Sequence, residues 1–290
     1  MVGIVSEDAG LRPHCTDGEE GVSARALAAL RQCAKGSGEL VKLHELTAYV
    51  DQLLRSREIS DYCPNGLQVE GRAEVRKIVS GVTASLALLE AAAAAGADLI
   101  LVHHGYFWKG EPPAVVGMKA CRLRLLLRED ISLLAYHLPL DVHPELGNNA
   151  QLGKHLGLEI EDSIDGGPAP LIWRGRLPEP LPAAEFGARL GEVLQRAPLH
   201  VPAGPAEIRT VAWCSGAGQR FIEQAAAAGG DAFFSGEISE PTTHIARECG
   251  LHYFAAGHHA TERFGVQALG EHLAERFGLS HQFIDIDNPA

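Results

Sequence analysis

The feature that most constrains the fold of this chain is an internal repeat. When the segment that begins at Arg76 is laid over the segment that begins at Arg209, an apolar strand, an Ala-rich helix and a second strand coincide. Matching Gly and Asp residues at a helix-to-strand turn are harder to obtain by composition than matching Ala. We therefore interpret the two segments as one βαβ unit that occurs twice. The alternative is a chance alignment of Ala-rich helices. The identical aligned pairs outside the Ala run include Glu90 and Glu223, Gly96 and Gly229, and Asp98 and Asp231.

Shorter patterns around the first copy agree with this order of elements. Apolar residues at helical spacing predict an amphipathic helix over 43–54, and the Pro64-Asn65-Gly66 sequence predicts a turn within 61–67. A strand over 77–81, a helix over 85–95 and a strand over 99–102 follow. Strands that alternate with helices in this way predict an α/β fold.

A length of 290 residues favours two units, and composition suggests where they divide. Eight of the sixteen prolines fall within 168–205, where we expect a small inserted unit with a strand over 171–177 and a helix near Phe186. We therefore expect a first α/β lobe over 41–165, a Pro-rich inserted unit over 166–206 and a second α/β lobe over 207–290. Residues 1–40 are expected to be a disordered extension with a helix-like stretch over 22–35, and we expect the native chain to begin near Val41.

Charge and hydropathy exclude several classes of protein. The net charge is −12, which makes a phosphate-tracking nucleic-acid binder unlikely because such proteins need a basic face. Glu90 and Asp98 interrupt the most apolar region, so no membrane span is expected. Acidic and basic residues also interrupt the N-terminal segment, which does not read as a signal peptide. We therefore expect a cytoplasmic protein without membrane partners.

Histidines gather beside the predicted strand ends. His103 and His104 follow the apolar run 99–102 and precede Gly105. Neighbouring side chains in a strand point to opposite faces, so these two can serve one site only where the strand ends, or each can bind a different metal. Eight of the fourteen histidines form the two groups: His103, His104, His137 and His143, then His244, His252, His258 and His259.

Carboxylates accompany these histidines. Asp141 follows a predicted buried strand over 133–140, and His258 and Glu262 are four residues apart, a spacing that places both on one face of a helix. Together with His103 and His104 they give three imidazoles and two carboxylates, which suit two cations better than one. Zinc, iron, manganese and nickel all accept such ligands. Asn148 and Asn149 are interpreted instead as N-cap residues of a helix that runs through Leu156.

These strings together closely resemble the Nif-three-like dinuclear metal-centre family, whose members are also known as GTP cyclohydrolase 1 type 2 homologues. The resemblance runs in the family's order from about residue 41 to 288 and leaves only the N-terminal extension unmatched. The segments that carry it are Asn65-Gly66-Leu67-Gln68-Val69, 98–105, His137-Leu138-Pro139-Leu140-Asp141, Ser235-Gly236-Glu237 and Gly257-His258-His259-Ala260-Thr261-Glu262.

The resemblance implies two interlinked α/β lobes with mixed sheets, a toroidal homohexamer and two divalent metal ions per subunit, the second lobe completing the site. It assigns His103 and His258 to one metal and His104 and Asp141 to the other, with Glu262 as the bridge. His259 stands where many members carry an aromatic residue, which adds a possible ligand or proton shuttle.

Two functions follow from these expectations. The first is a dinuclear-metal-dependent hydrolase that acts on a purine nucleotide or a related small molecule, with water attacking C8 of the purine. Glu237, His137 or His259 would move protons, and an aromatic run over 106–108 followed by Lys109 would hold a base and a phosphate, unless the run belongs to the core. The alternative is a non-catalytic hexameric scaffold or metal-handling protein. Oxidoreductase chemistry at a di-iron site is a weaker third possibility.

Overall fold

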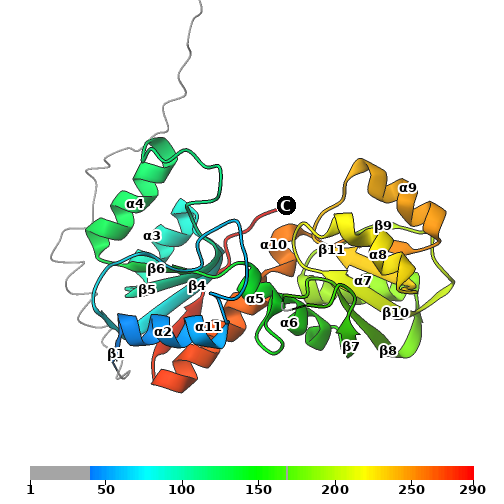
Figure 1. Cartoon of the computed structure of the whole chain (residues 1–290), viewed down its shortest axis with the longest axis horizontal. Coiled ribbons are helices and arrows are strands. Elements are labelled where there is room, and N and C mark those ends of the chain that lie inside the picture. Colours follow the sequence, from blue (N-terminus) through cyan, green and yellow to red (C-terminus); the bar gives the residue numbers. More distant parts are fainter. Residues whose placement is uncertain (1–39, 168) are drawn as a thin grey trace, which may run out of the picture.

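The computed structural model describes residues 40–167 and 169–290, which form two α/β lobes side by side (Figure 1). The expected extension 1–40, its helix-like stretch over 22–35 and the start near Val41 therefore concern a part of the chain that lies almost entirely outside the described residues. The α/β class with mixed sheets is confirmed. Among the described helices, none has the length and apolar character that a membrane span requires.

The first lobe contains a five-stranded sheet in the order β13-β4-β5-β6-β2. The first four strands of this order are parallel, and β2 runs antiparallel to β6. The predicted helix over 43–54 and strands over 77–81 and 99–102 are confirmed as α2, β4 and β5. The bounds are β13 Ser280–Phe283, β4 Lys77–Thr83, β5 Leu99–His104, β6 Ser132–Ala135, β2 Gly66–Val69, α2 Leu43–Leu53, α3 Leu86–Ala94, α4 Gly117–Glu129 and α11 Arg263–Phe277, with a small sheet of β1 Val41–Lys42 and β3 Glu74–Val75.

Alternation along β5 shows how this sheet is covered on both faces. Leu99 and Leu101 pack in a cluster with residues of α2 and α11. Ile100 and Val102 pack on the opposite face with residues of α3 and α4. All four side chains are fully buried, so the strand reads as a continuous apolar run, as expected for a parallel sheet between two helical layers.

The second lobe contains a six-stranded sheet in the order β7-β8-β10-β11-β12-β9. Strands β10, β11 and β12 are parallel, β8 and β9 run antiparallel to them on either side, and β7 pairs antiparallel with β8. Helices α6 and α7 pack on one face, and α8 and α9 pack on the other. The bounds are β7 Glu159–Ser163, β8 Trp173–Pro182, β10 Glu207–Cys214, β11 Ala232–Ser235, β12 His252–Ala255, β9 Leu199–Val201, α6 Asn148–His155, α7 Ala183–Leu194, η1 Gln219–Phe221, α8 Ile222–Ala227 and α9 Glu240–Cys249.

The internal repeat is confirmed in the hydrogen bonds as well as in the topology. The unit β4-α3-β5 of the first lobe corresponds to β10-α8-β11 of the second, and both strand pairs are parallel. The Asp98 carboxylate accepts the backbone N–H groups of residues 76 and 77 at 2.8 and 3.0 Å. The Asp231 carboxylate accepts those of residues 209 and 210 at 3.0 and 2.8 Å. Gly96 and Gly229, which precede these strands, both have a positive φ.

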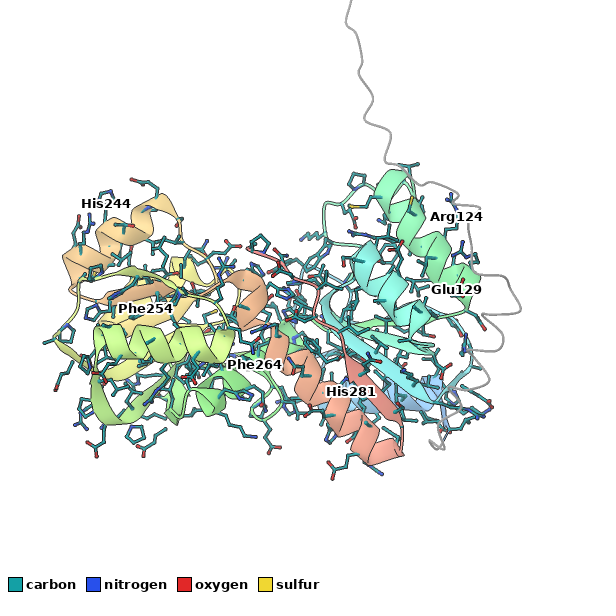
Figure 2. All side chains as sticks on the ribbon, turned by 180° about the vertical axis from the view of Figure 1, so that it is seen from behind. Arg124, Glu129, His244, Phe254, Phe264 and His281 are labelled. Carbon is teal, nitrogen blue, oxygen red and sulfur yellow. The ribbon has the colours of Figure 1, made fainter. Side chains whose placement is uncertain are left out.

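The sheets divide the chain differently from the expected boundaries. Strands β8 and β9, expected in a separate Pro-rich unit, belong to the second sheet, and so does β7. The prolines at 178, 180 and 182 fit in β8 because β7 pairs only with its residues 173–176 and the pairing with β10 is irregular between Ile208 and Thr210. Conversely, α11 and β13 return to the first lobe, which interlinks the two lobes. Figure 2 shows Phe264 at this junction, where its ring stacks on His155 of α6 with centroids 4.4 Å apart.

Candidate metal centre

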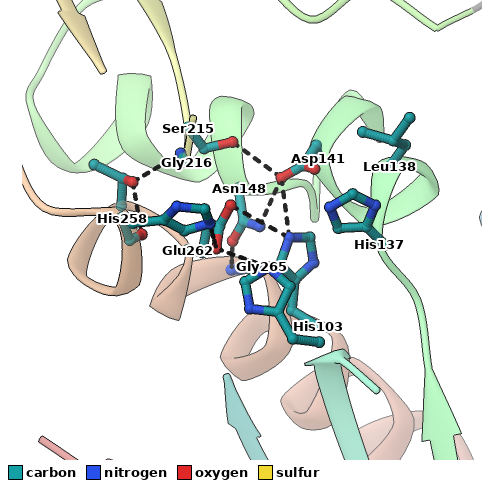
Figure 3. Close-up of polar contacts among 12 residues, drawn as sticks. His103, His137, Leu138, Asp141, Asn148, Ser215, Gly216, His258, Glu262 and Gly265 are labelled. Carbon is teal, nitrogen blue, oxygen red and sulfur yellow. Dashed lines mark hydrogen bonds and ion pairs between the residues drawn. The ribbon is translucent and has the colours of Figure 1, made fainter. Parts of the chain in front are cut away.

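The five side chains predicted as metal ligands lie together in the structure, and Figure 3 shows His103, Asp141, His258 and Glu262 among them. His103 and His104 end β5, and Asp141 lies on the short helix α5, Leu138–Val142. His258 begins α10, His258–Thr261, and Glu262 is the residue that follows it. The first three come from the first lobe, and the last two come from the junction that leads from β12 into α11. The site is therefore complete only when both lobes are folded.

Glu262 lies at the centre of the cluster. Its Oε1 atom is 3.5 Å from His103 Nε2, and its Oε2 atom is 3.2 Å from both His104 Nε2 and His258 Nε2. His103 Nε2 is also 3.6 Å from Asp141 Oδ1. One carboxylate therefore faces three imidazole nitrogens, an arrangement in which it can bridge two cations.

The side chains around Glu262 fall into two groups. The ligand atoms of His103, Asp141 and Glu262 lie within 4.8 Å of one another, and so do those of His104, His258 and Glu262. The family resemblance implies instead that His103 shares a metal with His258 and His104 with Asp141, and the assignment of each ligand to a cation stays a prediction. β5 continues through His104, so the two adjacent side chains leave the strand on opposite faces and reach different groups.

Each of these three histidines is fixed through its Nδ1 atom. His103 Nδ1 is 3.0 Å from the Tyr136 carbonyl oxygen, and His104 Nδ1 is 3.1 Å from Thr83 Oγ1. His258 Nδ1 is 2.8 Å from Glu237 Oε1. Partners of this kind fix the ring orientation and leave Nε2 free, which is the usual support for a metal-binding imidazole.

Asp141, on the first lobe, is held by side chains of the second lobe. Its Oδ1 atom accepts hydrogen bonds from Asn148 Nδ2 and Ser215 Oγ, each at 2.9 Å. Asn148 Oδ1 in turn accepts the backbone N–H of Gly265 at 2.8 Å. The prediction that Asn148 and Asn149 cap helix α6 is wrong, because Gly147 is the N-cap and makes no side-chain bond. Both asparagines are fully buried and connect α5 with the second lobe instead.

Two buried polar atoms in this cluster show that the donor set fits a cation. His103 Nε2 and Glu262 Oε2 have no hydrogen-bond partner among the described residues, although both atoms are buried. An unsatisfied buried polar atom is costly, and a metal ion would satisfy both at once. Imidazole nitrogens and carboxylate oxygens are also the ligands that zinc, iron, manganese and nickel share.

The pKa shifts in the metal-free cluster also favour a bound cation. Burial opposes the charged form of His103, but Asp141 and Glu262 outweigh it and raise the pKa of His103 to about 9. Burial is likewise outweighed at His258, where the neighbouring Glu262 and Glu237 carboxylates raise the pKa to about 9. Burial lowers the pKa of His104 to about 3, and the neighbouring histidines add to the effect. The two carboxylates thus favour positive charge between them, which divalent cations would supply.

Glycines let the second lobe approach the cluster closely. A Cβ atom on Gly216, whose φ is +58°, would lie 2.1 Å from Glu262 Oε1. A Cβ atom on Gly236 would lie 2.6 Å from the Cα atom of His258. The loops that follow β10 and β11 therefore need glycine at these positions, because any side chain would displace the bridging carboxylate or the helix that carries His258.

The three residues proposed to move protons have different surroundings. Glu237 contacts His258 and accepts a hydrogen bond from Gln219 Nε2 at 3.1 Å, so it orients the His258 ring. His137 is buried, and its ring lies 5.0 Å from that of His103. His259 Nε2 is 2.7 Å from Asp285 Oδ1, so its ring is held by the segment that follows β13.

Asp61 is a site residue that the sequence reasoning missed. Its side chain is 2% exposed and lies 3.0 Å from His137 Nδ1. Burial opposes its ionisation, but hydrogen bonds from His137, Asn65 and the Leu138 N–H outweigh burial and lower the pKa of Asp61 to about 2. Thr83 and Ser215 were missed as well. Both lie at the ends of the first strands of the two repeats, so the repeat itself was the signal that could have found them.

The aromatic run after His104 divides between core and site. Tyr106 is buried and its hydroxyl donates to the Ala84 carbonyl at 2.7 Å, so it belongs to the core. Phe107 faces Lys119, whose Nζ lies 4.7 Å from the ring centroid. Trp108 does line a pocket of about 370 Å³ beside the histidines, but Lys109 does not. Tyr62, which the sequence did not single out, lines the same pocket.

Comparisons with known proteins agree with this architecture. The family model Duf34/NIF3 (NGG1p interacting factor 3) matches residues 41–289. A Pseudomonas aeruginosa protein named GTP cyclohydrolase 1 type 2 homolog is 58% identical over 251 residues, which cover 86% of this chain and 99% of that protein. The solved structure of protein ybgI, described as of unknown function, is 54% identical with a TM-score of 0.83 and covers 86% of this chain and 100% of its own. Thermus thermophilus TTHA1606 is 37% identical with a TM-score of 0.79 over 86% of this chain and 100% of its own.

Proposed function

Because this chain belongs to the Duf34/NIF3 family, we propose that it is a metal-dependent hydrolase that acts on a purine nucleotide or a related small molecule. The observation that carries the proposal is the convergence of three imidazole Nε2 atoms and two carboxylates on one buried cluster in which His103 Nε2 and Glu262 Oε2 lack partners. Relatives named as homologues of GTP cyclohydrolase 1 type 2 support a purine nucleotide as the substrate.

In this proposal, His103 and Asp141 hold one divalent cation, His104 and His258 hold the other, and Glu262 binds both. Cations held in this way supply Lewis acidity and lower the pKa of water. Zinc, iron, manganese and nickel are all compatible with the ligand types.

The chain's own residues then have separate tasks. Glu237 accepts from His258 Nδ1 and keeps its Nε2 directed toward Glu262. Asp61 accepts from His137 Nδ1 and leaves the other ring nitrogen of His137 free to exchange a proton with a substrate in the pocket. His259 lines that pocket too, but its hydrogen bond to Asp285 gives it a supporting role.

Metal analysis by inductively coupled plasma mass spectrometry tests the proposal, followed by nucleotide-hydrolysis assays with the metal found. We expect about two metal ions per chain, lost in a His103→Ala, His258→Ala double variant and kept in a His44→Ala, His244→Ala control, whose histidines are exposed and remote from the cluster. Less than one metal per chain under varied loading conditions would refute the site.

Metal binding without hydrolysis of any purine nucleotide would favour the scaffold or metal-handling alternative. Assembly into a homohexamer stays a prediction, and light scattering on the purified protein measures it.

A further inference from the structure

The pocket beside the metal centre has an unusual lining. It consists of four histidines, the aromatic side chains of Tyr62 and Trp108, Thr83, and two residues of the segment that follows β13, Asn288 and Ala290. None of the residues that line it is Lys or Arg, and the chain as a whole carries a net charge of −12. The side chains of this pocket therefore offer π-faces and polar atoms, and no lysine or arginine for a phosphate.

Tyr62 and Trp108 form one wall of this pocket. Their ring centroids are 5.7 Å apart with an interplanar angle of 37°. Tyr62 is 53% exposed, so its ring is not used by the core. The Trp108 centroid lies 5.9 Å from that of His104 and 5.1 Å from that of His137. A flat group stacked on this wall would thus lie directly beside His104 and His137.

Hydrogen bonds and a strained backbone conformation at Phe107 hold this wall in place. Lys109 N–H donates to the Tyr62 carbonyl at 2.7 Å, which ties the two loops together. Trp108 Nε1 donates to the Gly105 carbonyl and Trp108 N–H to Glu111 Oε2, both at 3.2 Å. Phe107 has a φ of +66°, a left-handed conformation that bulky residues rarely adopt. Strain of this kind persists where the surrounding structure requires it, and here it turns Trp108 toward the pocket.

We propose that Tyr62 and Trp108 form a stacking platform for a flat heteroaromatic ring, and that this ring, and not a phosphate group, supplies most of the affinity of the substrate for the metal-free pocket. The inference rests on the proposed function, because it names the substrate class of the same site. It predicts that a nucleobase or nucleoside binds nearly as well as the corresponding nucleotide.

Isothermal titration calorimetry on protein stripped of metal with a chelator tests the platform, with guanosine, guanosine monophosphate and ribose 5-phosphate as probes. We expect both guanine compounds to bind with similar affinity and ribose 5-phosphate to bind at least about tenfold more weakly, since stacking contributes most of the affinity. Trp108→Ala should weaken guanosine binding roughly 5- to 150-fold. Trp108→Phe, which keeps a ring, should restore most of it and shows that the loop still folds.

Val115→Ala is the matched control, because Val115 is exposed in the same loop and does not line the pocket; it should leave guanosine binding unchanged. The proposal is overturned if guanosine does not bind at millimolar concentration, if Trp108→Ala binds it as wild type does, or if ribose 5-phosphate binds as tightly as guanosine monophosphate. Guanosine binding without hydrolysis by metal-loaded protein would refute the proposed function and leave the platform standing. Hydrolysis of a purine nucleotide by metal-loaded Trp108→Ala with the KM of wild type would do the reverse.

Discussion

Gly216→Ala should remove the bridging carboxylate from the metal centre without touching a ligand. The new Cβ would lie 2.1 Å from Glu262 Oε1 and 3.2 Å from His258 Nε2, so the carboxylate must move away. The left-handed backbone at φ +58° adds about 1–2 kcal/mol of strain for any residue with a Cβ. Changes that only disturb the hydrogen-bond partners of a ligand lower metal affinity about 10- to 100-fold. Displacement of Glu262 should therefore lower the affinity for both cations by about 100-fold or more.

Gly229→Ala is the matched control for this variant. Gly229 has a φ of +76°, yet a Cβ there would meet nothing within 4 Å. It should therefore lose the same 1–2 kcal/mol of unfolding free energy in urea and keep its metal affinity. Competition against a chelator of known affinity measures the binding, and urea unfolding of metal-free protein measures the strain. If Gly216→Ala binds metal as tightly as Gly229→Ala, then Glu262 is not a ligand and the reasoning fails.

Three further changes probe other parts of the molecule. Glu237→Gln removes the charged acceptor at His258 Nδ1 and should weaken metal binding about 10- to 100-fold by chelator competition, whereas the exposed Glu240→Gln should not; equal affinities would contradict the orienting role. Asp61 has a folded pKa of about 2, below its usual 3.8, so its ionised form stabilises the fold above pH 3.8 and this contribution is lost as pH falls toward 2. The unfolding free energy of metal-free wild type relative to Asp61→Asn should therefore shrink by about 2 kcal/mol between pH 5 and pH 2, and a pH-independent difference would refute the pairing. Leu269→Ala, at a fully buried position of α11, should cost about 2–5 kcal/mol in urea unfolding, and a loss below about 1 kcal/mol would show that α11 is not part of the core.

The repeat could be predicted because its signal is local. Asp98 and Asp231 each accept two backbone N–H groups from the start of the preceding strand, and this task requires an acidic residue at a fixed place. Gly96 and Gly229 have positive φ values that favour glycine. Identical backbone requirements in the two copies leave identical residues, which a single sequence reveals.

The partition of the ligands could not be predicted in the same way. Residue types identify His103 and His104 as donors, and Gly105 suggests a break directly after them; the pairing of β5 with β4 extends to His104. Each step along a strand turns the side chain to the other face, so the strand separates the two histidines. Which carboxylate each one approaches depends on the segments, distant in the sequence, that carry Asp141 and Glu262.

The lobe boundaries could not be predicted for a different reason. Proline content and length describe the chain locally, but membership in a sheet is decided by pairing between distant strands. Nothing in the sequence of 280–283 indicates that this strand pairs with β4, about 200 residues earlier. The roles of Asn148 and Ser215 are equally long-range, since both act on Asp141 across the lobe junction.

The position of β13 has a consequence for synthesis on the ribosome. Because β13 supplies the outermost strand beside β4, the edge of β4 stays unpaired until the last residues of the chain have emerged. An exposed, apolar strand edge is a template for aggregation. The nascent first lobe must therefore wait, through the synthesis of the entire second lobe, for α11 and β13 to cover it. Production of this protein should accordingly be more sensitive to translation speed and chaperone supply than the stability of the finished fold would suggest.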